Sequence, residues 1–526
     1  MKRLLAALTF ALAANAFASG LADHGEDLFK REETTVKLTG FFRVRGDWLH
    51  NLDLDRGTTP SGRPLYPVPL GDPTAQDLFV ADMRLRTDLA IYAPFAAAAV
   101  KVRADLVDDL VLGSTPALSP GTGTAPTPAA SPGQLPNTLL RIKRAYGEVL
   151  TPIGYFAAGR MGNLWGLGMY ANGGDCLDCN LGDQADRLAF VTAIAGHLWA
   201  FAYDFSSVAP TQLRKDSQRS LVFDPSSNVS SFTFALMNIR DPLSRERRRK
   251  AGRWTFEYGA YLSYRWQKND IPEAYLVVAQ PRALTPSSVM ERGFRAGVVD
   301  GWLRLQTPLF RLEAEAAFVL AESAQASLIP GALLRDPVQA FQAGAAVELQ
   351  FGTEADFFTG GVNGGFASGD PAPGFGAFPP SGSKPTPGEL DAPQVDVPRD
   401  VRVDNFRFHP DYRIDRLLFA ELIGTVTDAF YVKPWARARL LQFTSSQLGL
   451  KVDGTLSRAL FASSTPGNDA SLGVELHAAL SWDSKDGFDV LAEYAVLFPL
   501  AGLDNPAQGL SAQPAQLGRV RLAWRF

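Results

Sequence analysis

Between residue 35 and its end, the chain repeats segments of about ten to fifteen residues in which apolar and polar side chains alternate. In the first segment one parity is apolar (Val36, Leu38, Phe42), and the other is polar (Lys37, Arg43). Successive side chains of a strand point to opposite faces, so this pattern predicts strands with one apolar and one polar face. A soluble β-sandwich or propeller would also show it, and the links between the segments must decide.

The links alternate between short and long, and the sequence lacks the blade-length repeat of a propeller. This rhythm is typical of outer-membrane barrels, which have short periplasmic turns and long outer loops. We therefore predict an all-β fold, a transmembrane antiparallel β-barrel of 18 strands, with 16 as the fallback count. Among the links on the short-turn side, only 241–252 is longer than expected. The predicted strands are 35–49, 78–92, 97–110, 138–150, 154–161, 186–195, 197–206, 229–240, 253–267, 292–306, 309–321, 338–351, 355–368, 427–440, 446–459, 470–483, 487–499 and 517–526.

The first residues predict export. A basic pair, Lys2 and Arg3, precedes an apolar stretch, and Ala16-Phe17-Ala18 supplies the small-x-small pattern of a cleavage site. An N-terminal anchor is disfavoured because the apolar run is too short, and no later run is long enough for a membrane-spanning helix. We expect a signal peptide at 1–18, a short periplasmic segment at 19–34 and the barrel at 35–526, in the outer membrane of a Gram-negative bacterium.

The last strand is amphipathic and ends on Phe526. A terminal strand of this form looks like the signal recognised by the barrel-assembly machinery, which we expect as a partner together with outer-membrane lipid and lipopolysaccharide. A formal charge of -4 is too weak to indicate a nucleic-acid partner. The sequence leaves the oligomeric state open.

Several short motifs lie along the predicted strands and links. They are Lys143-Arg144-Ala145-Tyr146-Gly147-Glu148-Val149, Gly159-Arg160-Met161, Trp165-Gly166-Leu167-Gly168-Met169, Gly174-Asp175-Cys176-Leu177-Asp178-Cys179, Asp186-Arg187, Asp411-Tyr412-Arg413-Ile414-Asp415, Ala429-Phe430-Tyr431-Val432-Lys433-Pro434 and Leu497-Phe498-Pro499-Leu500. With these motifs the chain resembles an uncharacterised family of outer-membrane proteins known mainly from myxobacteria and their relatives. The family implies a barrel and an outer-membrane address but no substrate. In strand count and loop rhythm the chain is also similar to the 18-stranded alginate-export porins, and this likeness is architectural only.

Basic residues collect on the polar parity of neighbouring strands, and closure of the barrel brings the last strand beside the first. We predict a basic wall in the lumen, with an acidic wall formed by Glu313, Glu315 and Glu348 roughly opposite. Two opposed walls would select polar, often anionic, solutes. A plugged barrel filled with salt bridges fits the same residues, because aspartates lie in the same strands. The basic wall comprises Arg43, Arg45, Arg84, Arg86, Lys101, Arg103, Arg519 and Arg521.

The segment 171–187 is rich in Asp, Asn and Gly. Its carboxylates Asp175, Asp178, Asp183 and Asp186 could hold calcium, although their spacing matches no EF-hand. The pair Cys176 and Cys179 could ligate zinc, but a second pair of ligands is absent nearby. Outside the cytoplasm a local disulfide is favoured, and it would pin the tip of a loop that could fold into the pore.

An enzymatic function is not expected. The best histidine candidates are His409 and His477, and the sequence contains no nucleophile elbow, no H-E-x-x-H and no P-loop. No cofactor other than the possible calcium is indicated. The Pro- and Gly-rich links at 113–136 and 369–398 are expected to be solvated outer loops. We therefore expect a porin-like channel for small polar, possibly anionic, solutes. The alternative is a non-conducting barrel that acts as a surface scaffold, adhesin or assembly partner.

Overall fold

The computed structural model describes residues 34–72, 74–112, 140–213, 220–272, 283–327, 333–353, 356–380 and 383–526. The signal peptide expected at 1–18, the residues 19–33 and the link at 113–136 lie outside this range. No helix in the described part of the chain has the length and apolar character needed to cross a membrane.

Eighteen antiparallel strands form one closed sheet, in which each strand pairs with its neighbour in the sequence and β20 pairs with β1. The expected fold and strand count are therefore confirmed. The strands of the barrel are β1 (Thr35–His50), β2 (Asp77–Ala93), β3 (Ala98–Val111), β4 (Arg141–Thr151), β5 (Gly154–Gly162), β6 (Gln184–Ile194), β7 (His197–Ser207), β10 (Val229–Asn238), β11 (Thr255–Asp270), β12 (Met290–Gln306), β13 (Phe310–Ser323), β14 (Val338–Phe351), β15 (Phe358–Ala367), β16 (Ala429–Gln442), β17 (Ser446–Ala459), β18 (Ser471–Ser484), β19 (Phe488–Pro499) and β20 (Ala515–Arg525).

The remaining elements are short and lie in the links. A two-stranded hairpin, β8 (Thr211–Leu213) with β9 (Ser220–Val222), belongs to the link between β7 and β10. The single helical turns are η1 (Pro94–Ala96), η2 (Pro225–Ser227), η4 (Pro286–Ser288), η5 (Leu418–Leu422), η6 (Ala462–Ser464) and η7 (Ala501–Leu503). The nine-residue helix α2 (Pro242–Lys250) occupies the link that was longer than expected, and Asp241 caps its first turn by accepting a hydrogen bond from the Ser244 amide at 2.8 Å.

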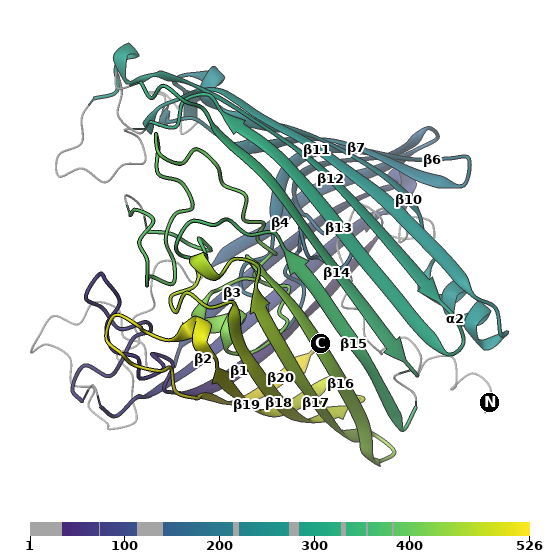
Figure 1. Ribbon diagram of the computed structural model, residues 1–526. Coiled ribbons are helices and arrows are strands. Elements are labelled where there is room, and N and C mark those ends of the chain that lie inside the picture. Colours follow the sequence, from purple (N-terminus) through teal and green to yellow (C-terminus); the bar gives the residue numbers. More distant parts are fainter. Residues whose placement is uncertain are drawn as a thin grey trace, which may run out of the picture.

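The two ends of the barrel differ. At one end, which we call the short-turn end, the strands are joined by tight turns or by α2 (Figure 1). The Gly40 and Phe526 backbones exchange hydrogen bonds there, at 3.0 and 3.1 Å. The other end, the long-loop end, carries the long links, including 51–76, 163–183 and 368–428. The alternating link lengths read from the sequence therefore correspond to two opposite rims.

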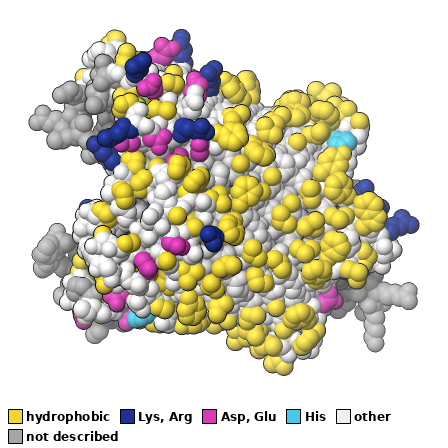
Figure 2. Space-filling model, in the orientation of Figure 1, with side chains coloured by type: hydrophobic (Ala, Val, Ile, Leu, Met, Phe, Trp, Pro, Cys, Tyr) yellow, Lys and Arg dark blue, Asp and Glu magenta, His cyan; other side chains and the backbone are white. Residues whose placement is uncertain are grey.

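The outward face of the wall is apolar. Figure 2 shows hydrophobic side chains across most of the visible barrel, with charged groups near the long-loop rim and around α2. Aromatic residues recur on the outer surface toward the short-turn end, as in the aromatic girdles of barrels that cross membranes. Among them are Trp254, Phe351, Phe357, Phe443 and Trp524, all exposed.

The link 368–428 folds into the long-loop half of the barrel, and the expectation of a solvated outer loop at 369–398 is wrong. In Figure 1 this green segment lies between the upper and lower walls. Phe375 is 0% exposed, and Phe406 and Phe408 are 1% exposed. They pack against small side chains on the inner face of six strands, which make room for the segment. These are Ala317, Ala346, Ala367, Ala429, Ala495 and Ala515.

Candidate functional site in the barrel lumen

The arginines predicted as a basic wall lie on the inner face of β20, β1, β2 and β3. Arg43 stands directly opposite Arg84 across the β1–β2 pair, and Arg45 opposite Arg521 across the β1–β20 seam. Arg43 and Arg84 are both completely buried. Like charges placed directly opposite each other destabilise a sheet, so this wall requires counter-charges.

Aspartates supply most of these counter-charges. Arg43 and Arg45 share Asp82, at 2.5 and 2.8 Å, and both also lie near Asp178. Each guanidinium of the wall has at least one carboxylate partner, and Lys101 pairs with Glu148. The remaining pairs are Arg43 and Arg84 with Asp109, Arg86 with Asp105 at 2.7 Å, Arg103 with Asp88 at 2.6 Å, Arg519 with Asp47 at 2.6 Å, and Arg521 with Asp489 at 2.8 Å. The basic wall is therefore neutralised rather than open to solutes.

The link 163–183, between β5 and β6, folds inward and covers this wall. Its backbone carbonyls accept hydrogen bonds from the wall: Leu177 from Arg43 at 2.7 Å, Cys179 from Arg84 at 2.5 Å, and Gly174 from Arg86 at 2.7 Å. We call residues 163–183 the inner loop. The Asp-, Asn- and Gly-rich composition singled out residues 171–187 as one segment, but it did not predict the contacts between this segment and the arginines.

The tip of the inner loop carries a disulfide between Cys176 and Cys179. On either side of it, Asp175 pairs with Arg103 and with Arg144, the latter at 2.8 Å. Asp178 meets Arg43, Arg45 and Arg521. Burial raises the pKa of Asp178, but the surrounding guanidinium groups outweigh this effect and hold the pKa below its usual value.

The four aspartates proposed for calcium do not converge. Asp175 and Asp178 face arginines of the wall, Asp186 pairs with Arg160 at 2.7 Å, and Asp183 lies 3.6 Å from His409. Over the described ranges, no three His, Cys, Asp or Glu side chains are grouped to hold a metal. Calcium binding by these residues stays a prediction that their arrangement does not favour.

The predicted acidic wall lies about halfway round the ring, on β13 and β14. Glu315 accepts hydrogen bonds from the backbone amides of the inner loop at Leu167, Met169 and Tyr170, at 2.5, 3.4 and 3.1 Å. Glu313 pairs with Arg304 at 2.7 Å. The inner loop thus begins on the acidic side of the lumen and reaches the basic side with its tip.

A second inward segment, within 368–428, packs on the inner loop. Asp411 accepts hydrogen bonds from the amides of Asn180, Leu181 and Gly182, at 3.0, 3.0 and 2.8 Å. The next residue, Tyr412, donates to Glu348 at 3.1 Å, and burial raises the pKa of this phenol. Both inward segments therefore touch the walls and each other, and together they obstruct the long-loop half of the lumen.

Glu475 on β18 anchors the same inward segment. Glu475 accepts hydrogen bonds from the amides of Arg416, Leu417 and Leu418, at 2.7, 3.1 and 3.2 Å. Asp415 caps η5 by accepting from Phe419 and Ala420. Burial raises the pKa of Asp415. η5 (Leu418–Leu422) therefore belongs to the part of the segment that these two carboxylates hold.

Three carboxylates thus bind runs of backbone amides in the same way, and we call Glu315, Asp411 and Glu475 the amide clamps. On the neighbouring strands β16 to β19, charged side chains of the inner wall form a row of ion pairs. Lys433 pairs with Asp453 at 3.1 Å, and His477 lies between Asp453 and Glu493, at 3.0 and 3.1 Å. This row places His477 in a structural role on the inner wall.

Some inward charges remain open to water. The Lys451 side chain is 44% exposed and that of Arg311 is 38% exposed, both toward the short-turn end of the lumen. Neither was among the predicted site residues, because exposure inside a barrel depends on which half the loops fill. Alternation alone gives the same signal for a covered and an uncovered inner residue.

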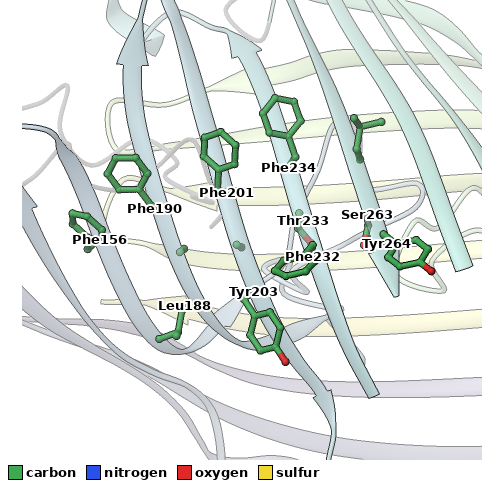
Figure 3. A pocket seen from close by; sticks show the side chains of 13 residues that line it. Phe156, Leu188, Phe190, Phe201, Tyr203, Phe232, Thr233, Phe234, Ser263 and Tyr264 are labelled. Atoms are coloured by element: carbon green, nitrogen blue, oxygen red, sulfur yellow. The ribbon is translucent and has the colours of Figure 1, made fainter. Parts of the chain in front are cut away.

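An apolar hollow of the surface lies outside the barrel. It measures about 650 Å³ and crosses β5, β6, β7, β10 and β11. Figure 3 shows Phe156, Phe190, Phe201 and Phe234 around it, on the outward face of the wall. This face belongs to the apolar belt, so the hollow is not on a path through the barrel.

Comparison with known proteins gives structural likeness only. No family model matches the chain, and no curated protein matches it. The outer-membrane channel DcaP of Acinetobacter baumannii aligns with 95% of this chain and 99% of its own, at 11% identity and TM-score 0.39. Pseudomonas aeruginosa OccK11 (OpdR) aligns with 93% of this chain and 96% of its own, at 8% identity and TM-score 0.44. An anion-selective porin from Comamonas acidovorans aligns with 94% of this chain and 100% of its own, at 8% identity and TM-score 0.41. At such values these likenesses carry no argument about solutes, and the barrel rests on its own strand pairing.

Proposed function

We propose that the protein is a porin-like channel of the bacterial outer membrane for small polar solutes, closed at rest by its two inward segments. The observation that carries the proposal is the presence of inward charges still open to water, Lys451 and Arg311, on the short-turn side of the two inward segments. A barrel that served only as a membrane anchor would have no need of a hydrated, charged interior.

The membrane address is supported by the closed sheet and its apolar outer face. A closed barrel leaves no unpaired strand edge, which is the condition for strands to cross a bilayer. The exposed aromatic residues near the short-turn end fit the boundary between lipid and water. We assign the short-turn end to the periplasm and the long-loop end to the outside, following the usual orientation of such barrels.

Single-channel recording in a planar bilayer tests the proposal. We expect brief, low-conductance openings of the wild-type protein. Longer openings are expected for a variant without the clamp, Glu475→Ala, because the second inward segment loses an anchor. A matched control is Glu322→Ala on the same barrel, since Glu322 makes only an exposed pair with Arg295. If neither wild type nor Glu475→Ala conducts at any salt concentration, the channel proposal is overturned.

A second candidate function is a non-conducting scaffold, and one observation favours it. The inward segments bring an apolar core into the barrel, including Leu417 at 0% and Leu418 at 1% exposure. Apolar packing of this kind is more costly to displace than a polar gate. Cross-linking the two inward segments should leave a scaffold fully active and abolish conduction by a channel, so the same recordings separate the two functions.

A further inference from the structure

The inner surface beneath the inward segments carries a pair of cations on neighbouring strands. Arg437 on β16 stands opposite Lys451 on β17. Both share the inner face of their strands with Lys433 and Asp453, which contact the inward segment and the inner wall. Since alternate residues of a strand lie on one face, Arg437 and Lys451 point into the lumen, farther toward the short-turn end.

This pair lacks a close counter-charge of its own. The nearest ion-pair partner of Lys451 is Asp453, whose carboxylate lies 3.8 Å away and already binds Lys433 and His477 more closely. Arg437 forms no ion pair within the portion of the chain that the structure describes; its charge acts only at longer range on Asp483 of β18. Two like charges directly opposite each other, without such a partner, favour the binding of an anion.

Neighbouring residues give the pair a shaped surrounding. Trp435 lies on the same face, its indole fixed by a hydrogen bond to Asn363 at 3.1 Å, and the Lys451 ammonium is 5.8 Å from the centre of its ring. Gly449, on the same face of β17, carries no side chain, and a Cβ placed there would lie 3.7 Å from Nε of Arg437 and 3.2 Å from Oγ of Ser481. This position therefore adds no side chain between Arg437 and the lumen.

A third cation faces the same space from β13. Arg311 lies 3.7 Å from Glu313 and 3.8 Å from Glu348, both longer than a close ion pair. Glu348 is 25% exposed and feels the charges of Arg311 and Lys451 together. Arg311 and Lys451 thus share the partly open Glu348, while Arg437 has only the more distant Asp483, and the positive charge of the three cations is in excess.

We propose that Arg437, Lys451 and Arg311, beside Trp435, form a binding site for a small organic carboxylate at the short-turn end of the lumen. Guanidinium and ammonium groups bind carboxylates through charge-assisted hydrogen bonds, and the indole supplies an apolar contact for the carbon skeleton. This site would make small organic carboxylates the substrate class of the channel, and this role in transport rests on the proposed function. The binding of a carboxylate at the site does not depend on that function.

The test is calorimetric titration of the full-length barrel in detergent with succinate, beside its neutral isostere succinamide. We expect succinate to bind and succinamide not to bind. The variant Arg437→Gln/Lys451→Gln should bind succinate at least about tenfold more weakly, as expected when charge-assisted hydrogen bonds are lost. The control Arg247→Gln/Lys250→Gln removes the same charge from α2, outside the lumen, and should bind as the wild type does.

The variant Glu348→Gln is expected to change the affinity for succinate in the opposite direction. A gain of this kind cannot come from misfolding, so it separates an effect of charge from a loss of folding. Removing this competing carboxylate should tighten succinate binding. The site is overturned if succinate fails to bind, if succinamide binds equally well, or if the Arg437→Gln/Lys451→Gln barrel retains wild-type affinity. Succinate binding without conductance steps would reject the channel and keep the site, whereas conductance without succinate binding would keep the channel and reject the site.

Discussion

At the scale of single residues, the amide clamps explain how irregular backbone is kept inside a barrel. A buried peptide group without a partner costs free energy, and an inward segment has many of them. Glu475 satisfies three amides with one carboxylate. Glu315 and Asp411 do the same for the inner loop. A carboxylate facing a run of amides therefore marks each point at which a segment is attached.

Replacing Glu475 should release one attachment point. Glu475→Ala leaves three amides without acceptors, at about 1–3 kcal/mol for each stranded donor, and the substitution should lower stability by about 3 kcal/mol or more. The midpoint of thermal unfolding measures this, and limited proteolysis should cut near residue 416 sooner. Glu475→Gln retains one acceptor oxygen and should lose clearly less. Equal melting of the Ala and Gln variants would contradict the clamp.

Asp428, in the link just before β16, should make stability depend on pH. Burial raises the pKa of Asp428 to about 7, although hydrogen bonds from Ser464 and the Phe461 amide oppose the rise. The folded protein therefore holds a proton that the unfolded chain loses near its ordinary value of 3.8. Stability attributable to this group falls as pH rises from about 4 to about 7 and stays lower above it.

The variant Asp428→Asn removes this titration. It should raise stability above pH 7, by about 4 kcal/mol at most, and change little near pH 4. Asparagine also tolerates the positive φ of 46° at this position. Thermal melts of both proteins across this pH range give the comparison. A constant difference at every pH would show that the substitution acts through packing and not through the proton.

At the scale of elements, the inner loop is a cover for the basic wall. Its carbonyls and aspartates meet guanidinium groups that would otherwise face the lumen. Replacing residues 174–181 by a short Gly-Ser linker should therefore expose uncompensated positive charge. We expect higher conductance and a reversal potential shifted toward anions in a salt gradient. The exposed segment 506–510, replaced in the same way, serves as control. Unchanged selectivity would mean that the wall does not border the path of ions.

The strands were predictable because lipid and lumen impose opposite demands on alternate residues. The boundaries read for β1, β14 and β17, at 35–49, 338–351 and 446–459, agree with Thr35–His50, Val338–Phe351 and Ser446–Ala459. The inward fold of 368–428 was not predictable from its Pro- and Gly-rich composition, which solvated loops share. A signal did exist, in Phe375, Phe406 and Phe408 and in the buried alanines opposite them, but only the tertiary structure connects the two sets.

The site residues divide in the same way. Parity placed the arginines and Glu315 on the inner face, because this depends on each strand alone. It could not show that Asp178 would cover the arginines, since that contact joins residues more than a hundred positions apart. Nor could it separate Lys451, which is open to water, from Arg84, which is completely buried. The difference lies in how deep the inward segments reach.

At the scale of the whole molecule, the charges of the basic wall pair with carboxylates inside the barrel. The arginine side chains of the basic wall are at most 14% exposed, and salt screens buried pairs much less than exposed ones. We expect the thermal unfolding midpoint to change little between about 0.1 M and about 1 M sodium chloride. Surface pairs such as Arg295 with Glu322 contribute little by comparison. A large fall in the midpoint with salt would show that water reaches the wall in the resting protein.

The contacts of Asp178 also bear on how the ring resists being pulled apart. The junction of β1 and β20 joins the first strand of the described barrel to the last, so no turn connects these two strands and non-covalent contacts hold them together. Asp178 reaches Arg43 and Arg45 on one side of this junction and Arg521 on the other. The inner loop therefore links the two strands at the junction where the barrel could open. Releasing the loop should lower the force needed to separate these strands, and it would also uncover the basic wall.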